Sequence, residues 1–139
     1  MFLEFDLDDV KEAGPAPTGK YELQVLGAIP QDSKGGAPMI VVSLGFVDSS
    51  LNYNTFKHWI SLPVQGDDKY EFKRLMLKRF LAAFDIPFRP GVEDEVLAQN
   101  MLAQTAFVEV KLNEPNATGF VSNNLNLPRL PDEGQGRRR

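Results

Sequence analysis

The sequence predicts a mainly β domain, an OB-type five-stranded barrel with a helix between the third and fourth strands. Two observations support this fold class. Three strand-like runs come first, a stretch with helical periodicity follows, and two more strand-like runs close the chain. Hydrophobic residues also make up 42% of the 139 residues, which is enough to fill one core. A mixed α+β sheet with the same order of elements is the main alternative.

The first three strands are expected over Lys20–Ile29, Met39–Val47 and Thr55–Leu62. The first alternates apolar and polar residues, as a half-buried strand does. The second is almost wholly apolar, which is typical of a central strand. The third divides into an inward face and an outward face, with Lys57 and Trp59 on the outward one.

Helical spacing replaces strand spacing over Asp68–Phe84, where Asp68 and Glu71 have the spacing of a capping box. An apolar stripe should bury one face of this helix: Phe72, Leu75, Met76, Phe80, Ala83 and Phe84. A second, shorter helix is expected over Val92–Gln104. The last two strands are expected over Ala106–Leu112 and Phe120–Leu127.

Composition divides the chain into an acidic N-terminal arm (1–18), the OB-like domain (19–131) and a flexible polar tail (132–139) that ends in three arginines. The net charge is −4, and the first twelve residues hold five acids against one lysine, so the remaining body is nearly neutral. There is no cysteine, which excludes disulfides, thiol catalysis and cysteine-ligated zinc and fits a reducing cytoplasm. No apolar run approaches the roughly 20 residues that span a bilayer, and no signal peptide is recognisable.

Nothing in the sequence indicates an enzyme. The single histidine, His58, shares the inward face of its strand and is expected to pack in the core. Motifs of serine hydrolases, phosphate-binding loops and zinc proteases are absent from the sequence. The acids at 93–95 are interpreted as the solvated start of a helix. We therefore expect no catalytic residue, no metal site and no cofactor.

The outward face of the third strand is the strongest binding candidate. An exposed indole at Trp59 beside the ammonium of Lys57 suits a single strand of nucleic acid, because bases stack on the ring and phosphates pair with the charge. On an OB barrel, the second and third strands and the first and last hairpin loops form such a face. The further residues expected there are Lys34, Tyr53, Lys111, Phe120 and Asn124. The alternative is that Trp59 is covered by the N-terminal arm or by a partner subunit.

Two stretches of the sequence resemble a family of small phage and prophage proteins. They are the strand start and hairpin loop from Pro17 to Met39 (Pro-Thr-Gly-Lys-Tyr, then Ser-Lys-Gly-Gly-Ala-Pro-Met) and the closing hairpin from Phe107 to Leu125 with its paired asparagines. Members of that family are usually taken as single-stranded DNA-binding proteins of the OB type that accompany replication or recombination genes. The resemblance implies the same fold and function here, in the cytoplasm of a bacterial host, with Lys34 carried over as a loop residue.

The expected function is thus sequence-tolerant binding of single-stranded DNA in phage DNA replication or recombination, with phage proteins of those processes as further partners and no membrane. Unpaired strand edges and the apolar second strand also favour a homodimer. Two rivals are a phage protein-interaction module without nucleic-acid binding, which the acidic balance favours, and an RNA-binding OB domain. The chain departs from many single-strand binders, which end in an acidic tail, because its acidic run is at the N-terminus.

Overall fold

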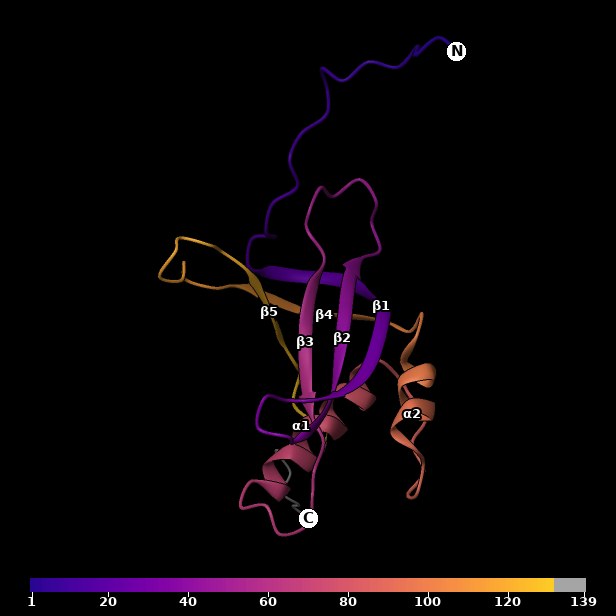
Figure 1. Ribbon diagram of the computed structural model, residues 1–139, viewed down its shortest axis with the longest axis vertical. Helices are drawn as coiled ribbons and strands as arrows, with labels where there is room; N and C mark the ends of the chain where they lie inside the picture. Colours follow the sequence, from indigo (N-terminus) through magenta and orange to yellow (C-terminus); the bar gives the residue numbers. More distant parts are fainter. Residues whose placement is uncertain (132–139) are drawn as a thin grey trace.

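The computed structural model describes residues 1–131, so the expected tail over 132–139, with its three arginines, lies outside the described residues. Five strands and two helices make up the fold (Figure 1). They are β1 (Gly19–Asp32), β2 (Pro38–Phe46), β3 (Phe56–Ser61), α1 (Tyr70–Ala83), α2 (Asp94–Met101), β4 (Thr105–Leu112) and β5 (Asn123–Asn126). Neither helix of this part of the chain has the length and apolar character needed to cross a membrane.

The strands form one antiparallel sheet in the order β3-β2-β1-β4-β5. The two end strands of this order, β3 and β5, are brought into contact because the sheet curls, so the barrel is nearly closed. This architecture confirms the predicted mainly β fold with an OB-type barrel. Both α1 and α2 lie between β3 and β4 in the chain, and a seam without strand pairing separates β3 from β5.

The curl of the sheet depends on β1, which is longer than the sequence predicts. Residues 19–24 of β1 pair with β4, and residues 23–32 pair with the whole of β2. The register with β2 shifts between Val25 and Gly27, so Leu26 is an extra residue, a β-bulge that bends the strand. The Leu26 side chain lies over Gly45 of β2, where any Cβ would come within 2.6 Å of it.

The core lies between the inner face of the sheet and the two helices. Leu23, Ile40, Val42, Leu44 and Val110 supply fully buried strand residues. The buried stripe of α1 differs from the predicted one, since it consists of Leu77, Phe80 and Leu81 and continues to Phe84. Phe72, which helical spacing assigns to the core, is instead 59% exposed.

The start of α1 also differs from the prediction. The helix begins at Tyr70, and no side chain caps it in the way that Asp68 and Glu71 were expected to. Asp67 takes a related role, because its carboxylate accepts the Lys69 backbone N–H at 3.0 Å and pairs with the Lys73 ammonium at 2.6 Å. These interactions hold the pKa of Asp67 at about 2. Glu71 pairs instead with Arg74.

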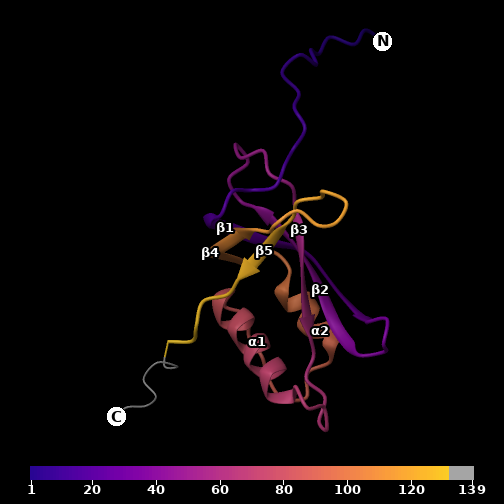
Figure 2. The ribbon, with the colours of Figure 1, turned by 90° about the vertical axis from the view of Figure 1, so that its left-hand side faces the viewer.

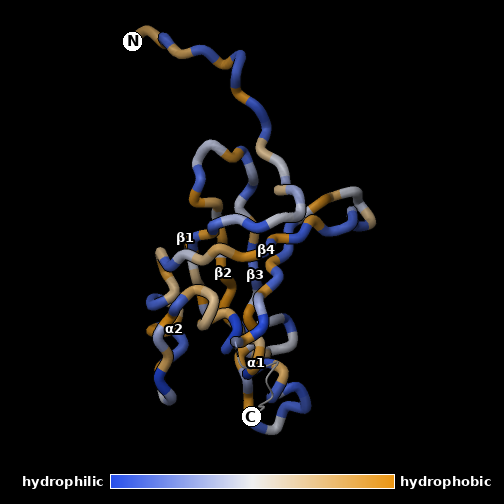
Figure 3. The backbone as a smooth tube through the Cα atoms, turned by 180° about the vertical axis from the view of Figure 1, so that it is seen from behind, coloured by the Kyte–Doolittle hydropathy of each residue, from blue (hydrophilic) through white to orange (hydrophobic). Residues whose placement is uncertain are grey.

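The N-terminal arm leaves the barrel at Gly14 and extends away from it, with alternating polar and apolar residues along its length (Figures 1 and 3). Residues 14–18, which composition groups with the arm, pack against the body. Ala16 is fully buried, and both its backbone polar groups bond to the side chain of Asn123 at 2.8 Å. The Asn123 amide also donates to the Lys111 carbonyl at 3.3 Å. Asn123 thus fastens the entering chain to β4 and β5.

Replacing Asn123 with Ala should destabilise the fold by about 2–3 kcal/mol, because it leaves the buried N–H and C=O of Ala16 without partners. Denaturant unfolding of the purified variant measures this. Asn124→Ala is the matched control, since the neighbouring side chain is exposed on the opposite face of β5. Equal stability of the two variants would contradict the fastening role.

Candidate nucleic-acid interface

A groove of about 520 Å³ lies along the seam between β3 and β5, at the end where β3 begins. One wall is the start of β3 with the residues before it, and the other is β5 with the β4–β5 loop. Four of the residues expected at the binding face line it: Lys57, Trp59, Phe120 and Asn124. We call this hollow the seam groove. It therefore unites side chains from two strands that are more than fifty positions apart in the sequence.

Trp59 stands on the outward face of β3, as the period-two pattern predicts. It pairs with Val41 of β2, its ring is 57% exposed, and the inward neighbours Phe56 and Ile60 are buried. The N-terminal arm extends away from the barrel in the described structure (Figure 1), and more than half of the surface of Trp59 is exposed.

Charged and polar groups surround the indole. Lys57 is exposed one pleat before Trp59, and among the described residues its ammonium has no carboxylate partner. Lys111 of β4 does not line the groove but pairs in register with Asn124, so both side chains point to the same outer face. Two ammonium groups and one amide thus lie at or beside the aromatic surface.

The β4–β5 loop is shaped by one asparagine. The Asn116 side-chain oxygen accepts the backbone N–H groups of Thr118 and Phe120, at 3.0 and 2.9 Å, and the Thr118 hydroxyl at 2.8 Å. Gly119 follows with a φ of 85°, a conformation that glycine adopts without strain. This turn holds Phe120 at the groove, where its ring is 64% exposed. Asparagine and glycine at this spacing are the sequence signal for such a turn.

Two of the expected residues lie elsewhere. Tyr53 packs edge-on against Tyr21 and Phe46, with ring centroids 5.8 and 5.3 Å apart, and does not line the seam groove. Its partners come from β1 and β2, which strand periodicity alone does not bring to the β2–β3 loop. Lys34 is exposed in the β1–β2 loop, at the other end of β3 from the β4–β5 loop.

The two hairpin loops nevertheless frame one surface. Figure 2 shows the β1–β2 and β4–β5 loops projecting to the same side of the barrel, with β2 and β3 between them. Between them, the side chain of Leu26 covers the backbone of β2 at Gly45. Sequence reasoning also missed Ile29, which follows the bulge and lies across β2 from Trp59, both paired with Val41.

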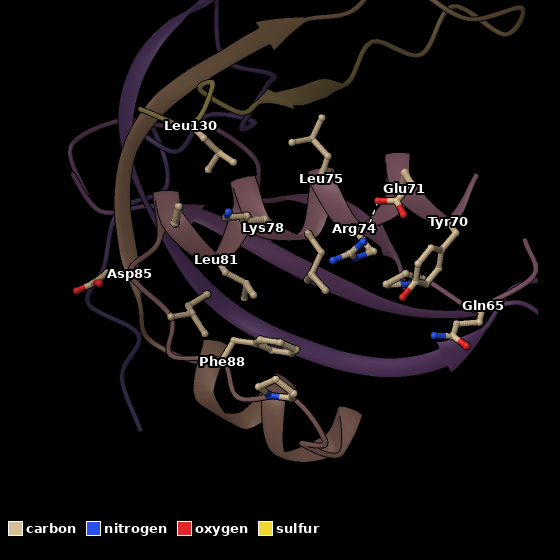
Figure 4. Close-up of a pocket in the computed structure, with 15 residues that line it drawn as sticks. Gln65, Tyr70, Glu71, Arg74, Leu75, Lys78, Leu81, Asp85, Phe88 and Leu130 are labelled. Carbon is tan, nitrogen blue, oxygen red and sulfur yellow. Dashed lines mark hydrogen bonds and ion pairs between the residues drawn. The ribbon is translucent and has the colours of Figure 1, made fainter. Parts of the chain in front are cut away.

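A larger hollow of about 910 Å³ lies between α1 and the segment 85–90 that follows it (Figure 4). Its floor is apolar, with Leu75, Leu81 and Phe88 pointing into it. Its arginine, Arg74, is paired with Glu71 at 2.8 Å. None of the residues predicted for binding lines this hollow, whose lining is mostly apolar and includes Lys78 beside the paired Arg74.

His58 packs inward, as expected of a core histidine. Its ring stacks on Phe80 with centroids 5.5 Å apart and planes 12° from parallel. Burial lowers the pKa of His58 to about 4, because the surrounding apolar groups cannot solvate an imidazolium. Within residues 1–131 no cluster of three or more histidine, cysteine or acidic side chains is placed to hold a metal ion.

The depressed pKa of His58 makes stability depend on pH. Between pH 6.5 and pH 4 the unfolded chain binds a proton that the folded chain excludes, so stability is complete above this window and falls as the pH drops through it. The expected loss from pH 7 to pH 5 is about 2 kcal/mol. The lowered pKa of Asp67 changes the folding stability only below about pH 4, outside this range.

The prediction is checked by denaturant unfolding of wild type and His58→Gln at pH 7 and pH 5. The variant lacks the titrating ring, so its stability should change less between the two pH values. The same pH dependence in both proteins would show that His58 does not exclude its proton.

In comparisons with known proteins, the chain matches no family model and no curated sequence.

Proposed function

We propose that this protein binds single-stranded DNA in the seam groove, without reading its sequence. Bases stack on Trp59 and Phe120, the ammonium groups of Lys57 and Lys111 meet phosphates, and the Asn124 amide hydrogen-bonds a base or a sugar. We further propose that the protein binds DNA and catalyses no reaction. The observation that carries the proposal is the presence of two exposed aromatic rings and an unpaired lysine in one groove.

Stacking explains why binding would tolerate any sequence. Every base offers a π face, and stacking on an aromatic side chain contributes about 1–3 kcal/mol per base. The groove is lined by two exposed rings, one lysine and several polar side chains, Asn124 among them. The rings favour an unpaired strand, whose bases are free to leave their own stack, and stacking on them does not distinguish one base from another.

The negative net charge does not oppose this proposal. The acids of the N-terminal arm lie on a segment that extends away from the barrel (Figure 3). Phosphates approaching β3 meet Lys57 and Lys111 at short range, and ions screen charges beyond about 8 Å at physiological salt. In the described part of the chain, the one charged side chain that lines the groove is that of Lys57, so a phosphate bound there has a cation as its nearest charge.

The role in phage DNA replication or recombination is a finer part of the proposal, supported by the resemblance of the strand start, the hairpin loop and the closing hairpin to phage proteins. A protein-interaction module is the second candidate. It is favoured by the exposed apolar residues of the arm and by the apolar hollow beside α1. A complex with a protein that is insensitive to salt, without affinity for oligonucleotides, would select that candidate.

The single tryptophan gives the first test. Oligo-dT should quench the fluorescence of Trp59, and higher salt should weaken the quenching. Trp59→Ala should bind fluorescein-labelled oligo-dT roughly 5- to 150-fold more weakly, as expected from the loss of one stacked base. The same titration with an RNA oligomer of equal sequence compares the two nucleic acids. A folded protein that shows neither quenching nor binding to labelled oligo-dT at low salt would overturn the proposal.

Lys57→Gln tests the phosphate contacts. Each phosphate neutralised on a single strand contributes about 0.7 to the slope of log affinity against log salt concentration. The variant should therefore bind more weakly and lose about that much of the slope. Lys78→Gln, on α1 and outside the groove, makes the same change of charge and should behave as wild type. Equal slopes for all three proteins would exclude a contact between Lys57 and a phosphate.

A further inference from the structure

A second hollow continues the seam beyond Trp59. It is a crevice of about 290 Å³ between the end of β3 and the first turns of α1, and we call it the β3–α1 crevice. Trp59 lines both this crevice and the seam groove, so the indole stands where the two meet. The two hollows together follow the open edge of β3 from the β4–β5 loop to α1.

The crevice contains a second exposed aromatic ring. Phe72 lines it from α1 and is 59% exposed, although its place in the apolar pattern of the helix predicts burial. The core stripe of α1 begins only at Leu77, so Phe72 contributes little to the packing of the core. An exposed phenyl ring on a crevice shared with an exposed indole is a surface that a flat apolar partner would cover.

The remaining groups of the crevice fit a nucleotide. Met76 and Leu127 add apolar lining. Lys73 is matched by Asp67 at 2.6 Å, whereas the ammonium of Lys69 has no carboxylate partner among the described residues. The volume is about ten times the space of one water molecule in the liquid, so a flat ring has room to enter. One free cation therefore stands beside one free aromatic face, as Lys57 does beside Trp59.

We propose that the β3–α1 crevice is a second base-stacking subsite, with Phe72 as its platform and Lys69 as its phosphate contact. The bound strand passes from the seam groove over Trp59 and on to α1. This inference rests on the proposed binding of single-stranded DNA and extends it, since it gives the direction in which the site continues. Oligonucleotides too short to leave the groove would not use the subsite, while longer ones would gain a further stacked base.

The test compares Phe72→Ala and Phe72→Tyr with wild type. Phe107→Ala is the matched control, because Phe107 is a comparably exposed phenylalanine on the outer face of β4, outside both hollows. Binding is measured by the anisotropy of labelled oligo-dT in a series of lengths from the trinucleotide upward. Circular dichroism establishes that each variant is folded.

Wild type should gain affinity as the oligomer grows past the groove. Phe72→Ala should lose that gain, binding long oligomers roughly fivefold or more weakly and the shortest ones as wild type does. Phe72→Tyr keeps an aromatic face and should retain the gain, as should Phe107→Ala. Lys69→Gln should lower the salt dependence for long oligomers only, by about 0.7 in slope.

The outcomes separate the two proposals. If Phe72→Ala binds every length as wild type does while Trp59→Ala is impaired, the subsite is overturned and the groove stands. If Phe107→Ala is weakened as much as Phe72→Ala, the effect is not specific to the crevice, and the subsite is also overturned. If wild type binds no oligo-dT of any length at low salt, the binding function itself fails and the subsite fails with it.

Discussion

The pairing of β1 with two strands at once is the constraint on which the structure depends. A fourteen-residue strand that lies between β2 and β4 in the sheet must bend if its neighbours are to curl round one core. The extra residue at Leu26 supplies the bend, because a bulge sharpens the local twist of a strand. That bend brings β3 and β5 together at the ends of the sheet.

The binding surface is a consequence of incomplete closure. Because β3 and β5 approach each other without pairing, their edges leave a seam where side chains of both strands meet. The seam groove lies where β3 begins, next to Asn123, which bonds to the buried Ala16. The β3–α1 crevice lies where β3 ends, beside α1, and Trp59 lines both hollows.

The charges are distributed so that an acidic chain can present a cationic surface locally. Acidic residues dominate the arm, which extends from the barrel (Figure 1). Near the seam, Asp67 is neutralised by Lys73, and Lys57, Lys69 and Lys111 carry no carboxylate partner among the described residues. Binding of a polyanion here would depend on these few lysines, and its affinity would fall with salt only with the shallow slope that a small number of neutralised phosphates gives.

The order of the elements and the two faces of each strand could be predicted from the sequence, because they depend on local periodicity. For that reason Trp59 was predicted outward and His58 inward. The remaining features depend on how the elements pack against each other. Phe72 lies outside the core because α1 packs against the sheet with Leu77 and Leu81 buried. Local spacing does not encode that position of the helix. Tyr53 packs in an aromatic cluster, and Phe120 and Trp59 line one groove, because the curl of the sheet unites segments that are distant in the chain.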